Sequence, residues 1–194
     1  VCELLRHGFG AYFIAVFDET WAIQKQLAPL VAGEIYPSVG LTEPEVAGSD
    51  PTLMQTSARL DGDDWVINGH KWFISNAHRA NFAILVARTE DDPDLPQAAN
   101  TAFLIDLPAE GWNEVRQIET MHGSTGHSEI VIEDLRVHES QMLGGRGQGH
   151  LLGQYRLGPA RLALALLPSL AAAGLARPPG RRAKNCPGPA VRVA

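Results

Sequence analysis

Apolar and polar positions alternate over much of residues 37–144, and this period of two predicts β-strands. Phe82–Arg88 is instead a continuous apolar run, which is typical of a strand buried on both faces. Asp61-Gly62 and Asn68-Gly69 favour tight turns between strands. The sequence therefore predicts an antiparallel β-sandwich or barrel of about seven strands. The other predicted strands are Thr52–Leu60, Trp65–Ile67, Lys71–Ile74, Thr101–Leu107, Trp112–Ile118 and Glu129–Val137.

The segments on either side have a helical pattern. Thr20 can cap a helix that runs to about Ala32, because apolar residues recur there at spacings of three and four and Gly33 follows. His150–Ala165 has a similar pattern, after a hinge-like linker of glycines at 144–149. We therefore expect an α+β chain. Its expected parts are the end of a helical domain at 1–36, a β-domain at 37–144, the start of a second helical domain at 145–166 and an atypical tail at 167–194.

Composition narrows the class of protein. The 194 residues are 45% hydrophobic and 20% charged, as in ordinary soluble domains. The net charge of −6 argues against a nucleic-acid-binding surface. The apolar stretch Leu162–Ala176 contains Pro168 and is too short to span a bilayer. Cys2 and Cys186 do not make a disulfide framework, so we expect a soluble, cytoplasmic protein, with a mitochondrial parent left open. The start at Val1 suggests a fragment.

Several kinds of site lack their sequence pattern. His122 and His127 lie in a turn-like segment without the spacing of a zinc site, so no metal is expected. The glycines at 144–149 lack the Gly-Lys-Ser/Thr ending of a phosphate loop. A Gly-x-Ser-x-Gly segment, which a serine hydrolase of the α/β type would need, is also missing from the sequence.

Two short motifs carry the strongest functional signal. Residues 41–50 read LTEPEVAGSD, and residues 65–76 read WVINGHKWFISN. Each places hydroxyl and turn-forming residues beside apolar or aromatic ones. Taken alone, Thr42 and Pro44 suit a local turn, and the Trp72-Phe73 pair suits a hydrophobic core. Together the motifs suit a flat ring with polar edges, such as a flavin.

The combination of these motifs resembles the signature of the acyl-CoA dehydrogenase family, in its middle β-domain. The resemblance extends from about Thr20 to about Ala163. The three residues between Pro44 and Gly48, together with the segments MHGS and RLGPARL, resemble the branch that contains family members ten and eleven.

The resemblance implies an oxidoreductase of fatty acid metabolism that is a flavoprotein. Its reaction would be the FAD-dependent α,β-dehydrogenation of an acyl-CoA thioester, in which a glutamate removes the α-proton and the β-hydride goes to flavin N5. It also implies an electron-transfer flavoprotein as partner and a homo-oligomer for the full-length protein.

By the same resemblance, Thr42 lies against the pyrimidine edge of FAD. Phe73 takes the place of a tryptophan that packs on the isoalloxazine, and Ser75 takes the place of a threonine that bonds near N5. Serine can make the same bond, and phenylalanine keeps the apolar face. The implied cofactor-binding residues are Gly40, Leu41, Thr42, Ser49, Phe73, Ile74 and Ser75, and the implied substrate-binding residues are Ser49 and Arg161.

No catalytic base is recognisable in the chain. In the family, the glutamate lies beyond the end of this chain or just before the arginine that matches Arg161, and here that residue is Ala160. Arg161 is itself a poor base. We therefore expect no turnover when the fragment is assayed with acyl-CoAs and a dye acceptor. The abrupt loss of pattern near Ala163 suggests a frameshift or fragment end, which the other two reading frames of the encoding DNA would test.

The sequence leaves two rival functions open. One is a non-catalytic β-sandwich binding module, which predicts no affinity for flavin. The other is a flavin monooxygenase or acyl-CoA oxidase built on the same fold. The segment Met121–Ser124 favours the dehydrogenase over the second rival.

Overall fold

The strands between Pro37 and Leu143 join into one hydrogen-bonded sheet. The structure, a computed structural model, describes residues 25–26, 28–48, 50–91, 94, 96–121, 123–155 and 157, all within the first of the chain's two units, Val1–Gly158. Within these residues the strand order is β6-β7-β3-β2-β4-β5-β8, and β1 pairs with β4 off this path. The strands are β1 (Pro37–Gly40), β2 (Ser57–Asp61), β3 (Asp64–Ser75), β4 (Phe82–Arg88), β5 (Asn100–Asp106), β6 (Trp112–Thr120), β7 (Gly123–His138) and β8 (Met142–Leu143).

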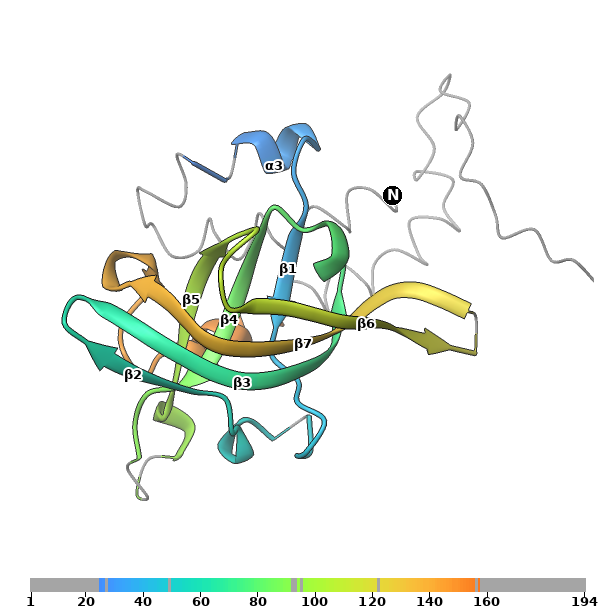
Figure 1. Ribbon diagram of the computed structural model, residues 1–194. Coiled ribbons are helices and arrows are strands. Elements are labelled where there is room, and N and C mark those ends of the chain that lie inside the picture. The colour runs from blue at the N-terminus through green and yellow to red at the C-terminus, as the bar shows by residue number, and fades with distance from the viewer. Residues whose placement is uncertain are drawn as a thin grey trace, which may run out of the picture. The chain divides into compact units, whose positions relative to one another are not determined.

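The sheet folds over into two layers. Strands β2, β3, β7 and β6 form the layer at the front of Figure 1, and β1, β4 and β5 lie behind it. The two layers join between β2 and β4, which pair in parallel only at Ser57 and Arg88. The other pairings are antiparallel, except that β1 runs parallel to β4. The predicted sandwich-like antiparallel β-domain flanked by helices is thus confirmed.

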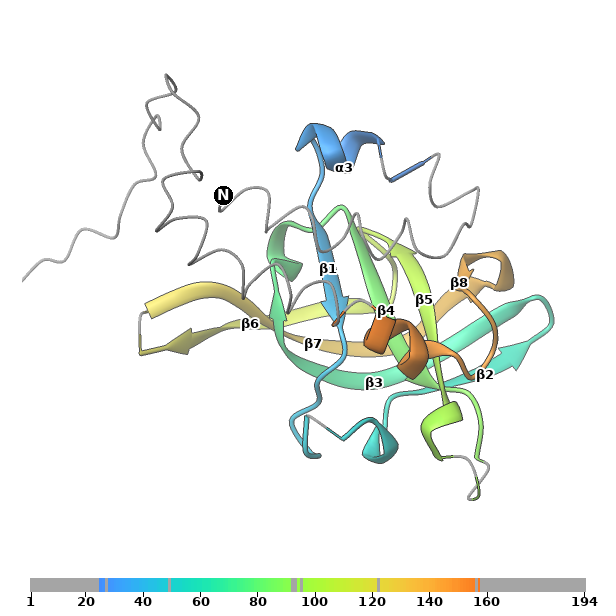
Figure 2. The same cartoon turned by 180° about the vertical axis from the view of Figure 1, so that it is seen from behind.

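Strand β4 is buried on both faces. Ala83, Leu85 and Ala87 point into the core between the layers, where Trp65 and Phe103 also meet with ring centroids 5.5 Å apart. The alternate residues of β4 pack on the opposite side. Their partners there include residues of α3 (Ala28–Ala32), β8 and the helical segment 149–155, which Figure 2 shows from behind. This double burial explains why Phe82–Arg88 is a continuous apolar run, as predicted.

The two turn signals have different outcomes. Asp61-Gly62 connects β2 to β3, with Gly62 in the left-handed region at φ 68°, so that prediction is confirmed. The prediction of a turn at Asn68-Gly69 is wrong, because β3 continues through both residues. The pairing of β3 with β7 shifts register between Ile67 and Gly69 instead. Asn68 accepts from the backbone N–H of Asp134 at 2.9 Å, so the asparagine stabilises a β-bulge rather than a chain reversal.

The predicted strand Thr52–Leu60 is wrong in its first half. Pro51–Leu53 is a single 3-10 turn, and β2 begins only at Ser57. Asp50 caps this turn, since its carboxylate accepts from both the backbone N–H and the hydroxyl of Thr52. The local capping interaction therefore takes precedence over the alternating pattern.

The flanking segments are described in part. Gly33, at φ 77°, ends α3 as predicted, whereas most of the helix expected from Thr20 lies outside the described residues. The glycine segment 144–149 is not a free linker, because Gly147 donates to the Thr101 hydroxyl at 2.9 Å and Gly145 donates to Gln148 at 3.0 Å. In the part of the chain that is described, the helices are too short or too polar to cross a membrane.

Candidate functional site

The two sequence motifs lie against each other where the chain leaves β1 and passes over β3. The backbone N–H of Trp72 donates to the carbonyl of Thr42 at 3.0 Å, and the Thr42 hydroxyl donates to the carbonyl of Trp72 at 2.6 Å. Three residues further along β3, the carbonyl of Ser75 accepts from the Ser38 hydroxyl of β1 at 2.9 Å. These bonds fix the segment 41–43 beside the second half of β3.

A buried ion pair joins the motifs beneath this surface. Lys71 is fully buried and its ammonium lies 2.9 Å from a carboxylate oxygen of Glu43, which is 2% exposed. The same ammonium donates to the carbonyl of Leu41 at 3.1 Å. Glu43 also accepts from the backbone N–H groups of Gln55 and Thr56, at 2.7 and 2.9 Å. The pair thus fixes the segment 41–43 to β3 and to the chain before β2.

Burial and pairing act in opposite directions on these two groups. Burial lowers the pKa of Lys71 to about 8, although the attraction of Glu43 raises it in part. Burial alone would raise the pKa of Glu43. The attraction of Lys71 and the hydrogen bonds from Thr56 and Gln55 outweigh that effect, so the pKa of Glu43 lies below its ordinary value. The glutamate is therefore held as a carboxylate.

Phe73 lies on the outer side of this junction in a strained conformation. Its φ is 54°, which is rare for a bulky residue, and the residue is 44% exposed. The strain coincides with a register shift between Lys71 and Ile74 in the pairing of β3 with β7. The ring contacts Trp72 edge-on at 5.0 Å between centroids. The fold thus keeps a phenyl ring exposed next to Trp72, the hydrogen-bond partner of Thr42, at a site of backbone strain.

A hydroxyl and an imidazole complete this surface. Ser75 lies opposite His127 of β7, and its Oγ is 3.0 Å from Nδ1 of the imidazole. The His127 ring also lies 6.1 Å from the Phe73 ring, centroid to centroid. We call the surface formed by Leu41, Thr42, Phe73, Ser75 and His127 the junction surface. It combines an exposed aromatic face with polar groups at its edge, which fits a flat heteroaromatic ring such as a flavin.

The residues predicted to bind the cofactor and the substrate differ in their exposure, and two of them lie outside the described residues. Gly40 is buried at the end of β1, where an added Cβ would be 3.1 Å from Leu85. Leu41 is partly exposed, but Ile74 is a core residue, so its side chain cannot contact a ligand on the junction surface. Ser49 and Arg161 lie outside the described residues.

Three residues of the site were not predicted. Glu43 and Lys71 form its buried support, and a signal for them existed, because Lys71 stands in a strand among apolar neighbours and an inward lysine needs a buried acid. His127 comes to Ser75 only through the pairing of β3 with β7, for which the sequence carries no local signal.

Besides the Glu43–Lys71 pair, a second polar network links the first motif, through Glu45, to strands β3, β7 and β6. The Nδ1 atom of His70 lies 2.7 Å from Glu45 and its Nε2 atom lies 2.9 Å from Glu129 of β7. Arg116 of β6 pairs with the other oxygen of Glu129 at 2.6 Å. Burial alone would lower the pKa of His70, but its bonds and ion pairs with Glu45 and Glu129 outweigh burial and raise that pKa.

This network predicts a pH-dependent stability. Because the pKa of folded His70 is raised above its unfolded value of about 6.5, its contribution is fully present below that value and is lost as the pH rises through the folded pKa. We expect His70→Gln to cost about 1 kcal/mol at pH 5.5 and much less at pH 8.5. Urea unfolding of both proteins at the two pH values measures this. Equal losses at both would contradict the prediction, and Glu45→Gln should reproduce part of the low-pH loss.

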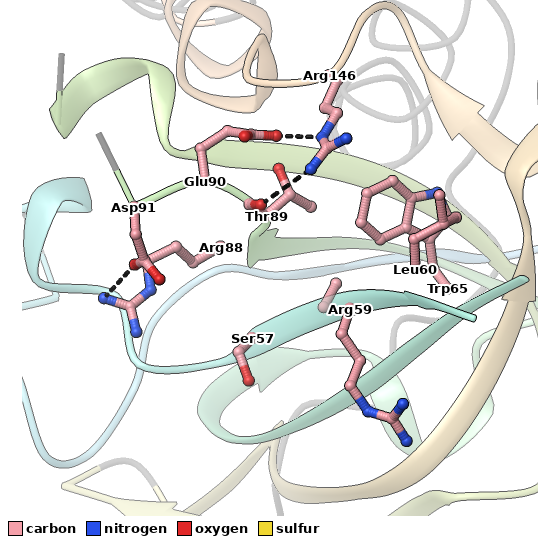
Figure 3. Close-up of a pocket in the computed structure, with 10 residues that line it drawn as sticks. Ser57, Arg59, Leu60, Trp65, Arg88, Thr89, Glu90, Asp91 and Arg146 are labelled. Atoms are coloured by element: carbon pink, nitrogen blue, oxygen red, sulfur yellow. Dashed lines mark hydrogen bonds and ion pairs between the residues drawn. The ribbon is translucent and has the colours of Figure 1, made fainter. Parts of the chain in front are cut away.

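A separate hollow of about 370 Å³ lies at the ends of β2 and β4 (Figure 3). Arg146 crosses its rim, where it pairs with Glu90 and lies over the ring of Trp65. Arg88 pairs with Asp91 at 3.4 Å on the other side. None of the residues of the junction surface lines this hollow. Within the described ranges, no group of three or more His, Cys, Asp or Glu side chains is arranged to hold a metal ion.

Comparison with known proteins places the chain in a family. The family model described as the acyl-CoA dehydrogenase middle domain matches residues 38–135, half of the chain. The chain belongs to the acyl-CoA dehydrogenase family. Acyl-CoA dehydrogenase family member 11 of Gallus gallus is 36% identical over 144 residues, which are 70% of this chain and 18% of that protein. Family member 10 of Mus musculus is 31% identical over 140 residues, 70% of this chain and 13% of that protein. The resemblance to the branch of members ten and eleven is thus confirmed.

Solved structures of acyl-CoA dehydrogenases share the fold. The acyl-CoA dehydrogenase of Geobacillus kaustophilus superposes with a TM-score of 0.74 at 27% identity, covering 84% of this chain and 43% of that one. Butyryl-CoA dehydrogenase of Megasphaera elsdenii gives 0.72 at 30% identity, covering 80% and 40%. The chain therefore spans less than half of these proteins, and only about a fifth of the length of the first curated relative.

Proposed function

We propose that this chain is the flavin- and acyl-CoA-binding middle part of an FAD-dependent acyl-CoA dehydrogenase. The observation that carries the proposal is the exposed residue Phe73, which stands on strained backbone in β3 between Trp72, the hydrogen-bond partner of Thr42, and Ser75. Strain of this kind persists where the surrounding structure imposes it, and it concentrates at binding sites. Membership of the family supports the same conclusion.

In this proposal each residue of the junction surface has a separate task. Phe73 offers an apolar face for the ring system, and Ser75 offers a hydroxyl at its edge. The hydroxyl proton of Thr42 is already donated to Trp72, so its oxygen remains as an acceptor. The Glu43–Lys71 pair holds the segment in place from below. FAD, when bound, supplies the hydride acceptor that no side chain can provide.

The buried carboxylate within the first motif, that of Glu43, cannot serve as the general base. Glu43 is 2% exposed, and both of its oxygens already accept hydrogen bonds. A general base must reach the proton that it removes, so Glu43 has a structural task instead. We propose that the base and the electron-transfer flavoprotein contacts belong to the full-length, oligomeric enzyme, that Arg161 of this chain contributes to acyl-CoA binding there, and that this chain alone has no turnover.

The proposal predicts that the purified chain binds FAD and that Phe73→Ala weakens binding roughly tenfold or more, because stacking on an aromatic ring contributes about 1–3 kcal/mol. Titration of FAD followed by flavin fluorescence and absorption gives both dissociation constants. Val115→Ala is the control, since Val115 is also an exposed apolar residue but lies on β6 outside the junction surface.

Two results would contradict the proposal. The first is a colourless chain that fails to bind added FAD, as expected of a β-sandwich module without a cofactor. The second is an equal affinity of the Phe73 and Val115 variants for FAD.

A further inference from the structure

His127 has a position in the site that its sequence surroundings do not explain. It is the cross-strand partner of Ser75, on β7, and its Nδ1 atom is 3.0 Å from the serine hydroxyl. Its ring also contacts the edge of Phe73, at 6.1 Å between centroids. The imidazole is therefore close enough to control the Ser75 hydroxyl of the junction surface.

The direction of the hydrogen bond between these two residues decides what Ser75 can do. A serine hydroxyl has one proton to donate and two lone pairs, and a neutral imidazole has one N–H and one acceptor nitrogen. If Nδ1 of His127 carries its proton, it donates to Ser75, and the serine proton remains free for a ligand. If Nδ1 is bare, it accepts the serine proton, and Ser75 can no longer donate. Thr42 cannot replace it, because its own proton is donated to Trp72.

We propose that His127 is a positioning residue of the flavin site, which donates from Nδ1 to Ser75 and so keeps the serine proton directed at the ring edge. This inference rests on the proposed function, since it assigns a hydrogen-bond donor to that same site. His127 acts through Ser75.

Two substitutions of similar size separate a donor from an acceptor at this position. His127→Gln places an amide that can donate to Ser75, and His127→Glu places a carboxylate that can only accept. We expect the glutamine variant of the 194-residue chain to bind FAD within about twofold of wild type. We expect the glutamate variant to bind about three- to tenfold more weakly, because a hydrogen bond to the flavin edge is lost. The absorption bands of bound FAD should shift in the glutamate variant alone.

The same pair of substitutions in a Ser75→Ala background is the control. Without the hydroxyl, the glutamine and glutamate variants should bind FAD equally, because His127 then has nothing to direct. A difference that persists there would mean that the charge acts directly, and would overturn the inference. Equal FAD affinities of the His127→Gln and His127→Glu variants in the presence of Ser75 would also overturn the inference. If Phe73→Ala still weakened FAD binding in that same experiment, the proposed function would stand. A wild-type chain that does not bind FAD would overturn both.

Discussion

Replacing Lys71 with methionine is expected to destabilise the fold by about 3–5 kcal/mol, because it leaves the carboxylate of Glu43 buried without its cation. The lysine is fully buried and the glutamate is 2% exposed, so water cannot replace the lost partner. Methionine has nearly the same length as the lysine stem and fills the same space. Urea unfolding followed by tryptophan fluorescence measures the loss, and a loss below about 1 kcal/mol would contradict the prediction.

A double variant separates the cost of an unpaired charge from the value of the pair itself. Lys71→Met combined with Glu43→Gln removes both charges, and the glutamine can still accept from one of the two backbone N–H groups, of Gln55 or of Thr56. We expect this protein to be more stable than the Lys71→Met single variant, because no unpaired charge remains. If the double variant is the less stable one, the unpaired carboxylate is not the source of the loss and the argument from desolvation is wrong.

The Glu43–Lys71 pair also shows which part of the site the amino-acid sequence of the chain can predict and which part it cannot. The structure brings the two motifs together, as their joint interpretation as one site predicts, and the assignment of that site to a flavin stays a prediction. What joins them, however, is an ion pair between residues far apart in the sequence, and its geometry depends on where β1 ends and β3 passes. The sequence predicts that Phe73 offers an apolar ring face to a ligand. Its left-handed backbone conformation accompanies the register shift between β3 and β7, and the residue type does not predict it.

The fold was predictable where a local signal and the tertiary structure agree. The apolar run of β4 fits a strand buried on both faces, and Asp61-Gly62 fits a hairpin turn with left-handed φ. Asn68-Gly69 carries a similar turn signal but lies within β3, because Asn68 bonds across to Asp134 and Gly69 packs closely on Thr56. A dipeptide signal cannot tell a turn from a bulge when the deciding contact comes from another strand.

The second large loss of stability is expected at the same bulge of β7, on the side that faces β6. Gly111 lies next to it, before β6, and its carbonyl accepts from the N–H of Glu133 at 3.0 Å. Asp134, the next residue of β7, has a φ of 48°. An added Cβ on Gly111 would be 2.4 Å from the carbonyl oxygen of Glu133, so backbone atoms would have to move. Gly111 therefore allows β6 to approach β7 at the bulge.

Gly111→Ala is expected to destabilise the fold by about 2–4 kcal/mol. Its φ of 85° costs an alanine about 1 kcal/mol, and the clash with Glu133 adds about 1–3 kcal/mol. Gly62→Ala is the matched control, because Gly62 also has a left-handed φ, of 68°, but an added Cβ there meets nothing within 4 Å. That variant should lose only about 1 kcal/mol in the same urea experiment. Equal losses in the two variants would mean that conformation alone sets the cost and that β6 can move away from the bulge.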